Sequence, residues 1–200
     1  MRRYGGWRAL VVAPLAAVVL SACAQASADA FAGAVMPQPR QVPATPLHDT
    51  SGRPFSLADS TDRRLTLVFF GYTHCADECP TTMATLASAL LRLDEDDRAN
   101  TQVVFVTTDP ARDTPPVLRD WLDHFSSSFV GVTASAATVK AVAERVGVPV
   151  EKGRRLPSGG YDVSHGTPVL AVDGKNTVPV MWTLGTTAPE FAHDIHQLLE

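Results

Sequence analysis

Two cysteines stand four positions apart where an apolar run gives way to a helix-forming stretch. Cys75 and Cys79 occur in the segment GYTHCADECP, residues 71–80. Before them, the run LTLVFF at residues 65–70 predicts a buried strand. After them, Pro80 favours a first helical turn, and the helix is expected to continue to residue 93. A strand that passes directly into a helix is the first unit of an α/β fold, and it places the pair at the positive end of a helix dipole, where thiolates are favoured.

The spacing of the pair allows either a disulfide or a two-sulfur metal site. On one helical turn the two α-carbons would lie about 6 Å apart, which a disulfide can bridge. The same separation lets both sulfurs face one ion. Two thiolates suit a soft ion such as Cu(I), and a nearby imidazole makes a site that also holds Cu(II). Zinc normally takes a fourth ligand. The third cysteine of the chain, Cys23, lies near the N-terminus and outside the expected domain, so it does not supply one. A purely structural disulfide is the remaining alternative, although so short a loop gains little entropic stabilisation.

The first 22 residues have the composition of a bacterial lipoprotein signal peptide. Three arginines precede an apolar stretch at residues 9–20, which is too short to span a bilayer. The segment LSAC at residues 20–23 resembles a lipoprotein cleavage site, which implies that Cys23 becomes the lipidated first residue. An ordinary secretory signal, cut after Ala22 or Ala28, is the alternative. Either signal predicts an extracytoplasmic protein.

The rest of the chain divides into a tether and one domain. Residues 23–46 are rich in Ala, Ser, Pro and Gln and are expected to be a flexible tether, followed by a single domain at residues 47–200. The signal segment holds three of the 17 basic residues and none of the 21 acidic ones, so the mature chain has 14 basic residues and a formal net charge of −7. That charge argues against nucleic acid as a partner.

The order of the predicted elements indicates a mixed α/β domain. A small hairpin at residues 48–55 comes first, and a helix at residues 188–199 comes last. The elements between them are expected as strands at residues 65–70, 103–106, 169–172 and 178–184 and as helices at residues 80–93, 117–125 and 133–146. Early βαβ units followed by an antiparallel pair give a mixed sheet flanked by helices. The predicted architecture is thioredoxin-like, with a short N-terminal hairpin.

Three segments of the domain resemble the Sco/SenC family, across roughly residues 45–200. They are GYTHCADECP at residues 71–80, TTDPARDTP at residues 107–115 and YDVSHGTPVLAVDG at residues 161–174. Members of that family are membrane-tethered, thioredoxin-like proteins associated with copper delivery during cytochrome c oxidase assembly. The resemblance therefore implies a copper metallochaperone that serves the CuA site of an oxidase subunit and is lipid-anchored to the bacterial cell membrane.

The resemblance also implies the copper ligands. Cys75 and Cys79 match the family's cysteine motif, and His165 matches its histidine position, just before a predicted strand. The pair supports an alternative function as well, a thiol–disulfide oxidoreductase that reduces cysteines of the CuA subunit or of another extracytoplasmic partner. A thiol reductase or another copper carrier would be a further partner. Copper delivery alone is not an enzymatic reaction, so an enzyme is expected only under the alternative.

Residues around the pair carry secondary expectations. Ala76 and Glu78 depart from the family motif, and the Glu78 carboxylate is expected to raise the thiol pKa values by like-charge repulsion. Met83 is expected in the core rather than on copper. The five histidines other than His165, including His74 beside the first cysteine, are expected to play no part as ligands.

The other two segments of the resemblance leave alternatives open. Thr167-Pro168 resembles the cis-proline step of thioredoxins, and the cis and trans forms are equally expected. Asp109 and Asp113 either steer a positive ion or form a turn and the start of a helix. Residues 151–160 are expected to form a projecting basic loop, which either docks an acidic partner or is simply solvated.

Overall fold

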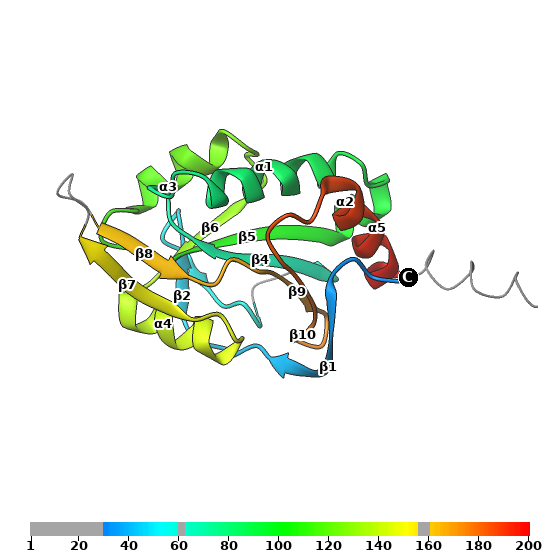
Figure 1. Ribbon diagram of the computed structural model, residues 1–200, viewed down its shortest axis with the longest axis horizontal. Coiled ribbons are helices and arrows are strands. Elements are labelled where there is room, and N and C mark those ends of the chain that lie inside the picture. The colour runs from blue at the N-terminus through cyan, green and yellow to red at the C-terminus, as the bar shows by residue number, and fades with distance from the viewer. Residues whose placement is uncertain (1–29, 60–62, 156–160) are drawn as a thin grey trace, which may run out of the picture. The chain divides into compact units, whose positions relative to one another are not determined.

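The computed structural model describes residues 30–59, 63–155 and 161–200, and the unit from Phe31 to Glu200 is built around one large sheet. The eight strands of this sheet follow the order β1-β10-β9-β4-β5-β6-β2-β3, and β7 and β8 form a separate two-stranded ribbon (Figure 1). The sheet is mixed, because β4 pairs parallel with β5 and antiparallel with β9. The predicted thioredoxin-like architecture is thereby confirmed.

Along the chain, strands and helices alternate only in the middle, from β5 to α4, with runs of strands before and after. The strands are β1 (Ala34–Gln41), β2 (Leu47–Asp49), β3 (Pro54–Phe55), β4 (Leu65–Gly71), β5 (Thr101–Thr107), β6 (Val130–Thr133), β7 (Val150–Arg155), β8 (Tyr161–His165), β9 (Val169–Asp173) and β10 (Thr177–Trp182). The helices are α1 (Glu78–Leu90), α2 (Glu95–Asn100), α3 (Pro115–Asp123), α4 (Ala136–Arg145) and α5 (Ala188–Leu199).

The core of the domain forms around β4. Every residue of this strand is buried, which explains why its sequence is apolar at all positions but Thr66 rather than alternating between apolar and polar. Helices α1 and α3 lie on one side of the sheet and α4 on the other (Figure 1). α1 turns Met83 and Leu86 fully into the core, and the ring of Phe191 on α5 lies 5.1 Å from that of Trp182 on β10. Met83 is therefore a core residue, as expected.

Residues 34–41 differ from the tether predicted for residues 23–46, because they form β1 and pair antiparallel with β10. The sequence of β1 is mostly polar and contains Pro37 and Pro39, so no apolar pattern marks it. Most of its residues are exposed, and its hydrogen bonds go to an edge of the sheet supplied by the far end of the chain. Residues 1–29, which include the predicted signal peptide and Cys23, lie outside the described residues.

Three further differences concern short elements. Residues 95–100, which lie outside every predicted helix and strand, form α2, and the carboxylate of its N-cap Asp94 accepts a hydrogen bond from the backbone N–H of Asp97 (2.8 Å). Val130–Thr133 forms β6, a strand that the sequence analysis missed. The expected basic loop instead supplies β7, which pairs antiparallel with β8.

Among the described residues, no helix has the length and apolar character needed to cross a membrane.

Candidate metal centre

The cysteine pair follows the last residue of the central strand β4. That residue is Gly71, and a Cβ atom there would come within 2.8 Å of the Phe69 ring and 2.9 Å of the Phe105 ring. Only glycine fits this position without displacing those rings. The carbonyl of Gly71 also accepts a hydrogen bond from the backbone N–H of Thr108 (2.7 Å). The loop that carries the cysteines therefore starts from a fixed point in the core.

Cys75 lies in this loop and Cys79 in the first turn of α1. The helix begins at Glu78, after the N-cap residue Asp77. The expectation that both cysteines share one helical turn is therefore wrong, because the helix starts only after Cys75. The chain still brings them together, since the backbone N–H of Cys79 donates a hydrogen bond to the Cys75 Sγ at 3.3 Å. The sulfur of Cys75 thus accepts from an N–H group at the positive end of the helix.

The two thiols have different surroundings. Cys75 and Cys79 are not joined by a disulfide in this structure; Cys75 is half-buried and Cys79 is completely buried. Burial raises the pKa of the Cys79 thiol far above its ordinary value, with further raising contributions from its hydrogen bond to Cys75 and from the charges of Cys75 and Glu78. A backbone hydrogen bond from Tyr72 opposes this shift without cancelling it. The expected effect of Glu78 on a thiol pKa is therefore confirmed for Cys79, and the accessible sulfur is that of Cys75.

Asp113 anchors the loop that carries Cys75. Its carboxylate is fully buried and accepts hydrogen bonds from the backbone N–H of Thr73 (3.0 Å), from the Thr73 hydroxyl (2.6 Å) and from the Thr107 hydroxyl (2.6 Å). The helix α3 has Thr114 as its N-cap, with no side-chain cap bond. The helix does start at this point, as one alternative expected, but the buried Asp113 carboxylate does not cap it and instead holds the cysteine loop. The sequence analysis missed this anchoring role, since the partners lie 40 residues apart in the chain.

Asp109 has a structural role beside this anchor. Its side chain is 4% exposed and pairs with Arg112. Its backbone carbonyl accepts from the N–H groups of Arg112 (3.1 Å) and Asp113 (3.0 Å), so the acid stiffens a turn. The guanidinium carbon of Arg112 lies 5.7 Å from the centre of the Tyr72 ring, which connects this turn to the cysteine loop. The turn alternative expected for Asp109 is therefore the one that the structure supports.

His165, the expected imidazole ligand, is the last residue of β8. Its backbone is paired with that of Val150 on β7, and the next residue, Gly166, donates a hydrogen bond to the Pro149 carbonyl (2.9 Å). The side chain of His165 lies outside the described part of the chain. The peptide bond between Thr167 and Pro168 is trans, so the likeness to the cis-proline step of thioredoxins is withdrawn.

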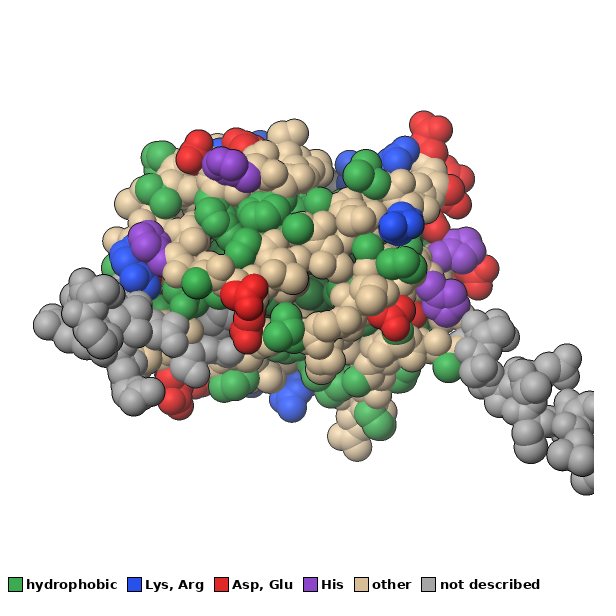
Figure 2. All heavy atoms as spheres, turned by 45° about the horizontal axis from the view of Figure 1, so that its top comes forward, with side chains coloured by type: hydrophobic (Ala, Val, Ile, Leu, Met, Phe, Trp, Pro, Cys, Tyr) green, Lys and Arg blue, Asp and Glu red, His purple; other side chains and the backbone are tan. Residues whose placement is uncertain are grey.

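The described imidazoles of four other histidines have partners away from the sulfurs or lie at the surface. His74 is about half exposed, and its Nδ1 lies 3.1 Å from the Thr73 hydroxyl and 3.8 Å from Asp113. His124 contacts the Asp120 carbonyl (2.8 Å), while His193 and His196 contact Asp194 (3.1 Å) and Asp97 (2.7 Å). Figure 2 shows histidine and acidic side chains gathered at the right-hand end of the face that it draws.

The fold and the dithiol at the start of α1 define a thioredoxin-like protein with a candidate two-sulfur metal site. The SCO1/SenC family model matches residues 39–200, and the chain belongs to that family. A Stutzerimonas stutzeri protein is 33% identical over 131 residues, which cover 66% of this chain and 63% of that protein. The mitochondrial SCO2 protein of Saccharomyces cerevisiae is 32% identical over 128 residues, which cover 64% and 42% of the two chains. The chain thus spans less than two thirds of the length of these curated relatives.

Solved structures of Sco proteins share the fold. Apo Sco1 from Thermus thermophilus superposes with a TM-score of 0.76 at 28% identity and covers 86% of this chain and 99% of that one. Bradyrhizobium japonicum ScoI, whose structure was solved with copper bound, gives a TM-score of 0.67 at 27% identity and covers 84% and 99% of the two chains.

Proposed function

We propose that this protein is a copper metallochaperone that carries copper as its cargo on Cys75, Cys79 and His165 and delivers it to the CuA site of cytochrome c oxidase. The observation that supports this most directly is the approach of two thiols that no disulfide joins, one just before α1 and one in its first turn, with the Cys79 backbone N–H donating to the Cys75 sulfur at 3.3 Å. Two sulfurs in this arrangement suit a soft cation. His165 at the end of β8 is the proposed third ligand.

Relatives support copper as the cargo. The structure of Bradyrhizobium japonicum ScoI contains bound copper, and the name of the Stutzerimonas stutzeri relative refers to copper binding. One further protein of this fold, at 17% identity, is described as a member of the Sco family of cytochrome c oxidase assembly proteins. Release of copper to an oxidase subunit is consistent with the unequal burial of the thiols, because the half-buried Cys75 is the sulfur that an incoming ligand can reach first.

Copper titration of the fully reduced protein tests this proposal. The parent should take up one equivalent of copper, with a sulfur-to-copper charge-transfer band for Cu(II), and the His165→Ala variant should bind much more weakly and change that band. His124→Ala is the matched control, because His124 is exposed and its imidazole contacts the backbone carbonyl of Asp120 on α3. Uptake of no copper, or equal binding by His165→Ala and the parent, would refute the proposal. Thiol exchange would instead be supported if Cys75→Ser abolished an activity that His165→Ala spared.

The proposed location is the outer side of a bacterial cell membrane, with residues 1–22 removed as a signal peptide and Cys23 lipidated. A SCO1/SenC protein of Bacillus anthracis with the same fold is described as a lipoprotein. A Cys23→Ser variant should move from the membrane fraction to the soluble fraction or keep its uncleaved signal. Unchanged membrane attachment with normal processing would contradict lipidation at this residue.

A further inference from the structure

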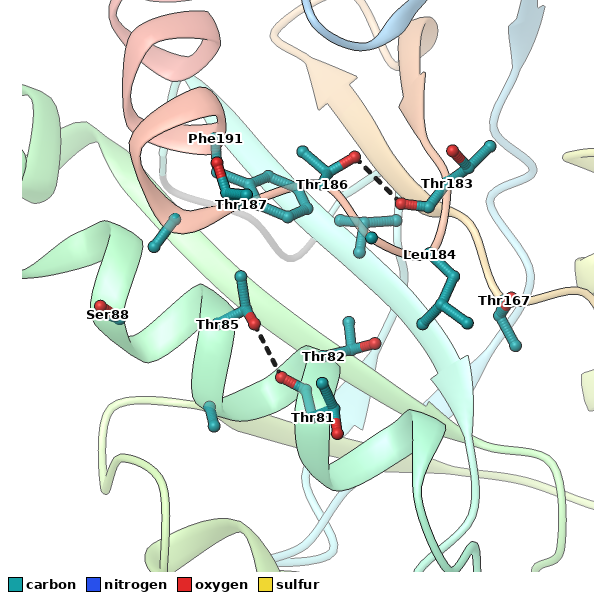
Figure 3. Close-up of a pocket in the computed structure, with 14 residues that line it drawn as sticks. Thr81, Thr82, Thr85, Ser88, Thr167, Thr183, Leu184, Thr186, Thr187 and Phe191 are labelled. Atoms are coloured by element: carbon teal, nitrogen blue, oxygen red, sulfur yellow. Dashed lines mark hydrogen bonds between the residues drawn. The ribbon is translucent and has the colours of Figure 1, made fainter.

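A groove of about 590 Å³ lies between α1 and the segment that joins β10 to α5 (Figure 3). One wall is formed by α1, with the exposed Thr81, the partly buried Thr85 and the buried Thr82. The other wall contains Leu184 and Thr186. In Figure 3 the side chain of Leu184 points toward α1, whereas the hydroxyl of Thr186 points to the Thr183 carbonyl. Neither Cys75 nor Cys79 lines the groove, but the groove begins close to the cysteine loop, at Thr81.

The two chain segments that carry the proposed copper ligands continue directly into this groove. Thr81 and Thr82 follow Cys79 by two and three residues on α1, and Thr167 follows His165 by two residues. A protein that removes copper from the proposed ligands has to bring its own ligands to the same place. The residues next to those incoming ligands then meet the neighbouring surface, and this groove is a neighbouring surface that both ligand segments share.

The lining of the groove is uncharged and rich in hydroxyl groups. Of its fourteen lining residues seven are threonines and one is a serine, and none carries a charge. The hydroxyls of Thr82, Thr85 and Thr186 donate to backbone carbonyls of their own segments at 2.8, 2.9 and 3.0 Å. A hydroxyl that donates its proton inward still offers lone pairs outward. The walls thus present acceptors that suit the backbone N–H groups of an extended chain.

The groove also has an apolar component. Phe191 and Val169 are almost fully buried beneath it, whereas Leu184 is 50% exposed at its rim. A charged segment would lose hydration here without finding an opposite charge among the lining residues, which is costly. The charge and hydrogen-bonding character of the groove therefore match an extended, uncharged segment with small or apolar side chains.

We propose that this groove docks an extended, uncharged segment of the copper-accepting protein, adjacent in that protein to the residues that take the metal. This proposal rests on the proposed function, because the occupant is the recipient of the copper. Docking here would hold the recipient's ligands next to Cys75 and Cys79 while one set of copper bonds replaces the other. The groove would then set the rate of transfer to the protein partner without contributing to copper affinity.

Copper transfer from the loaded protein to the CuA-bearing domain of the oxidase from the same organism tests the docking proposal. We expect Leu184→Arg and Leu184→Asp each to slow transfer at least tenfold at low acceptor concentration. Copper affinity and the rate of copper loss to a small chelator should stay within twofold of the parent, because a chelator does not use the groove. Leu91→Arg and Leu91→Asp are matched controls, since Leu91 is also an exposed leucine, at 79%, but does not line the groove.

The outcomes separate this proposal from the proposed function. A parent that binds no copper overturns both. A parent that delivers copper while both Leu184 variants keep pace overturns the docking proposal alone. If only one of the two Leu184 variants slows transfer, the occupant is charged, which overturns the docking proposal. If the Leu91 variants slow transfer equally, the effect is a general one of surface charge, which also overturns the docking proposal. A dimer of the parent that Leu184→Arg dissociates would place a second copy of this chain in the groove and reject the recipient segment.

Discussion

The carboxylate of Asp113 holds Thr73 by two hydrogen bonds, one from the backbone N–H at 3.0 Å and one from the hydroxyl at 2.6 Å. Thr73 lies two residues before Cys75, and Asp113 lies just before α3. The same carboxylate accepts from Thr107 at the end of β5, so it ties the cysteine loop to the sheet. A buried acid far along the chain thus sets where the accessible thiol can lie.

Replacing Asp113 by alanine should destabilise the fold and loosen the cysteine loop together. Three donors, the Thr107 hydroxyl buried and the two of Thr73 partly buried, would lose a charged acceptor, which is expected to lower the free energy of unfolding by about 3 kcal/mol. Chemical denaturation measures this loss, and amide hydrogen exchange should become faster at Thr73 and Cys75 than in the rest of the domain. Asp120→Ala is the control, because Asp120 is exposed on α3 and the change should stay within about 0.5 kcal/mol. Uniformly faster exchange would show a general loss of stability rather than release of this loop.

The two thiols should react at very different rates in the folded protein. The pKa of the Cys79 thiol is raised and the side chain is fully buried, so at pH 8 it is protonated and shielded, whereas Cys75 is half-buried. Because the thiolate is the nucleophile, iodoacetamide should modify Cys75 at least about tenfold faster than Cys79. Mass spectrometry of the peptides, quenched at intervals, gives both rates in one sample. In denaturant the two rates should converge, and similar rates in the native protein would contradict the assigned burial.

The sequence predicts the elements that are marked by their own residues, but not those defined by distant partners. The apolar run of β4 and the amphipathic pattern of α5 are visible locally, and both were expected close to their observed positions. β1 could not be recognised, because it is mostly polar and exposed and gains its strand conformation from β10 at the other end of the chain.

The candidate site also has a part that the sequence predicts and a part that depends on distant residues. The spacing of the two cysteines, together with the strand and helix patterns on either side, identifies the pair from the sequence alone. Whether both lie on one helical turn depends on where α1 begins, and a local pattern does not fix this to within two residues. The anchoring by Asp113 depends on packing between β4, β5 and α3, which a single sequence does not reveal.

The contact between α2 and α5 should make part of the stability depend on pH. Side-chain atoms of Asp94, Asp97 and His196 lie within 4.8 Å of one another, and the hydrogen bond and charge of Asp97 raise the pKa of His196 above its ordinary value of 6.5, with smaller contributions from Glu200 and Asp94. The folded state thus holds the proton more tightly than the unfolded chain. The resulting stabilisation is fully present below pH 6.5 and is lost as the pH rises through the raised pKa.

A His196→Gln variant tests this pH dependence. Its melting temperature should fall furthest below that of the parent near pH 5.5, and the difference should shrink by pH 9. Adding Asp97→Asn to both proteins should remove most of the pH-dependent part, since the largest raising contributions come from Asp97 and only the smaller ones of Glu200 and Asp94 remain. A difference that is constant across this range, or one that grows as the pH rises, would contradict the role assigned to the Asp97 contact.

Asp194 should decide whether β1 stays on the sheet. Its side chain is fully buried on α5 and accepts hydrogen bonds from the backbone N–H groups of Ala32 (3.1 Å) and Gly33 (2.8 Å) and from the indole N–H of Trp182 (2.7 Å). Burial alone would raise the pKa of Asp194, but these hydrogen bonds and the one to His193 outweigh burial, so its pKa lies below the ordinary value. The stabilisation is therefore present above pH 3.8 and is lost as the pH falls through the lowered pKa.

Asp194→Ala should lower the free energy of unfolding at pH 7 by about 3 kcal/mol, because three donors lose a charged acceptor. Amide exchange in β1 should rise more than in β4, since the chain immediately before β1 is held by this carboxylate and β4 is held by strands on both sides. Glu144→Ala is the control, because its ion pair with Lys140 is exposed and removing it should cost less than about 1 kcal/mol. If β1 keeps its protection while the domain as a whole is destabilised, Asp194 acts through Trp182 and the core rather than through the N-terminal segment.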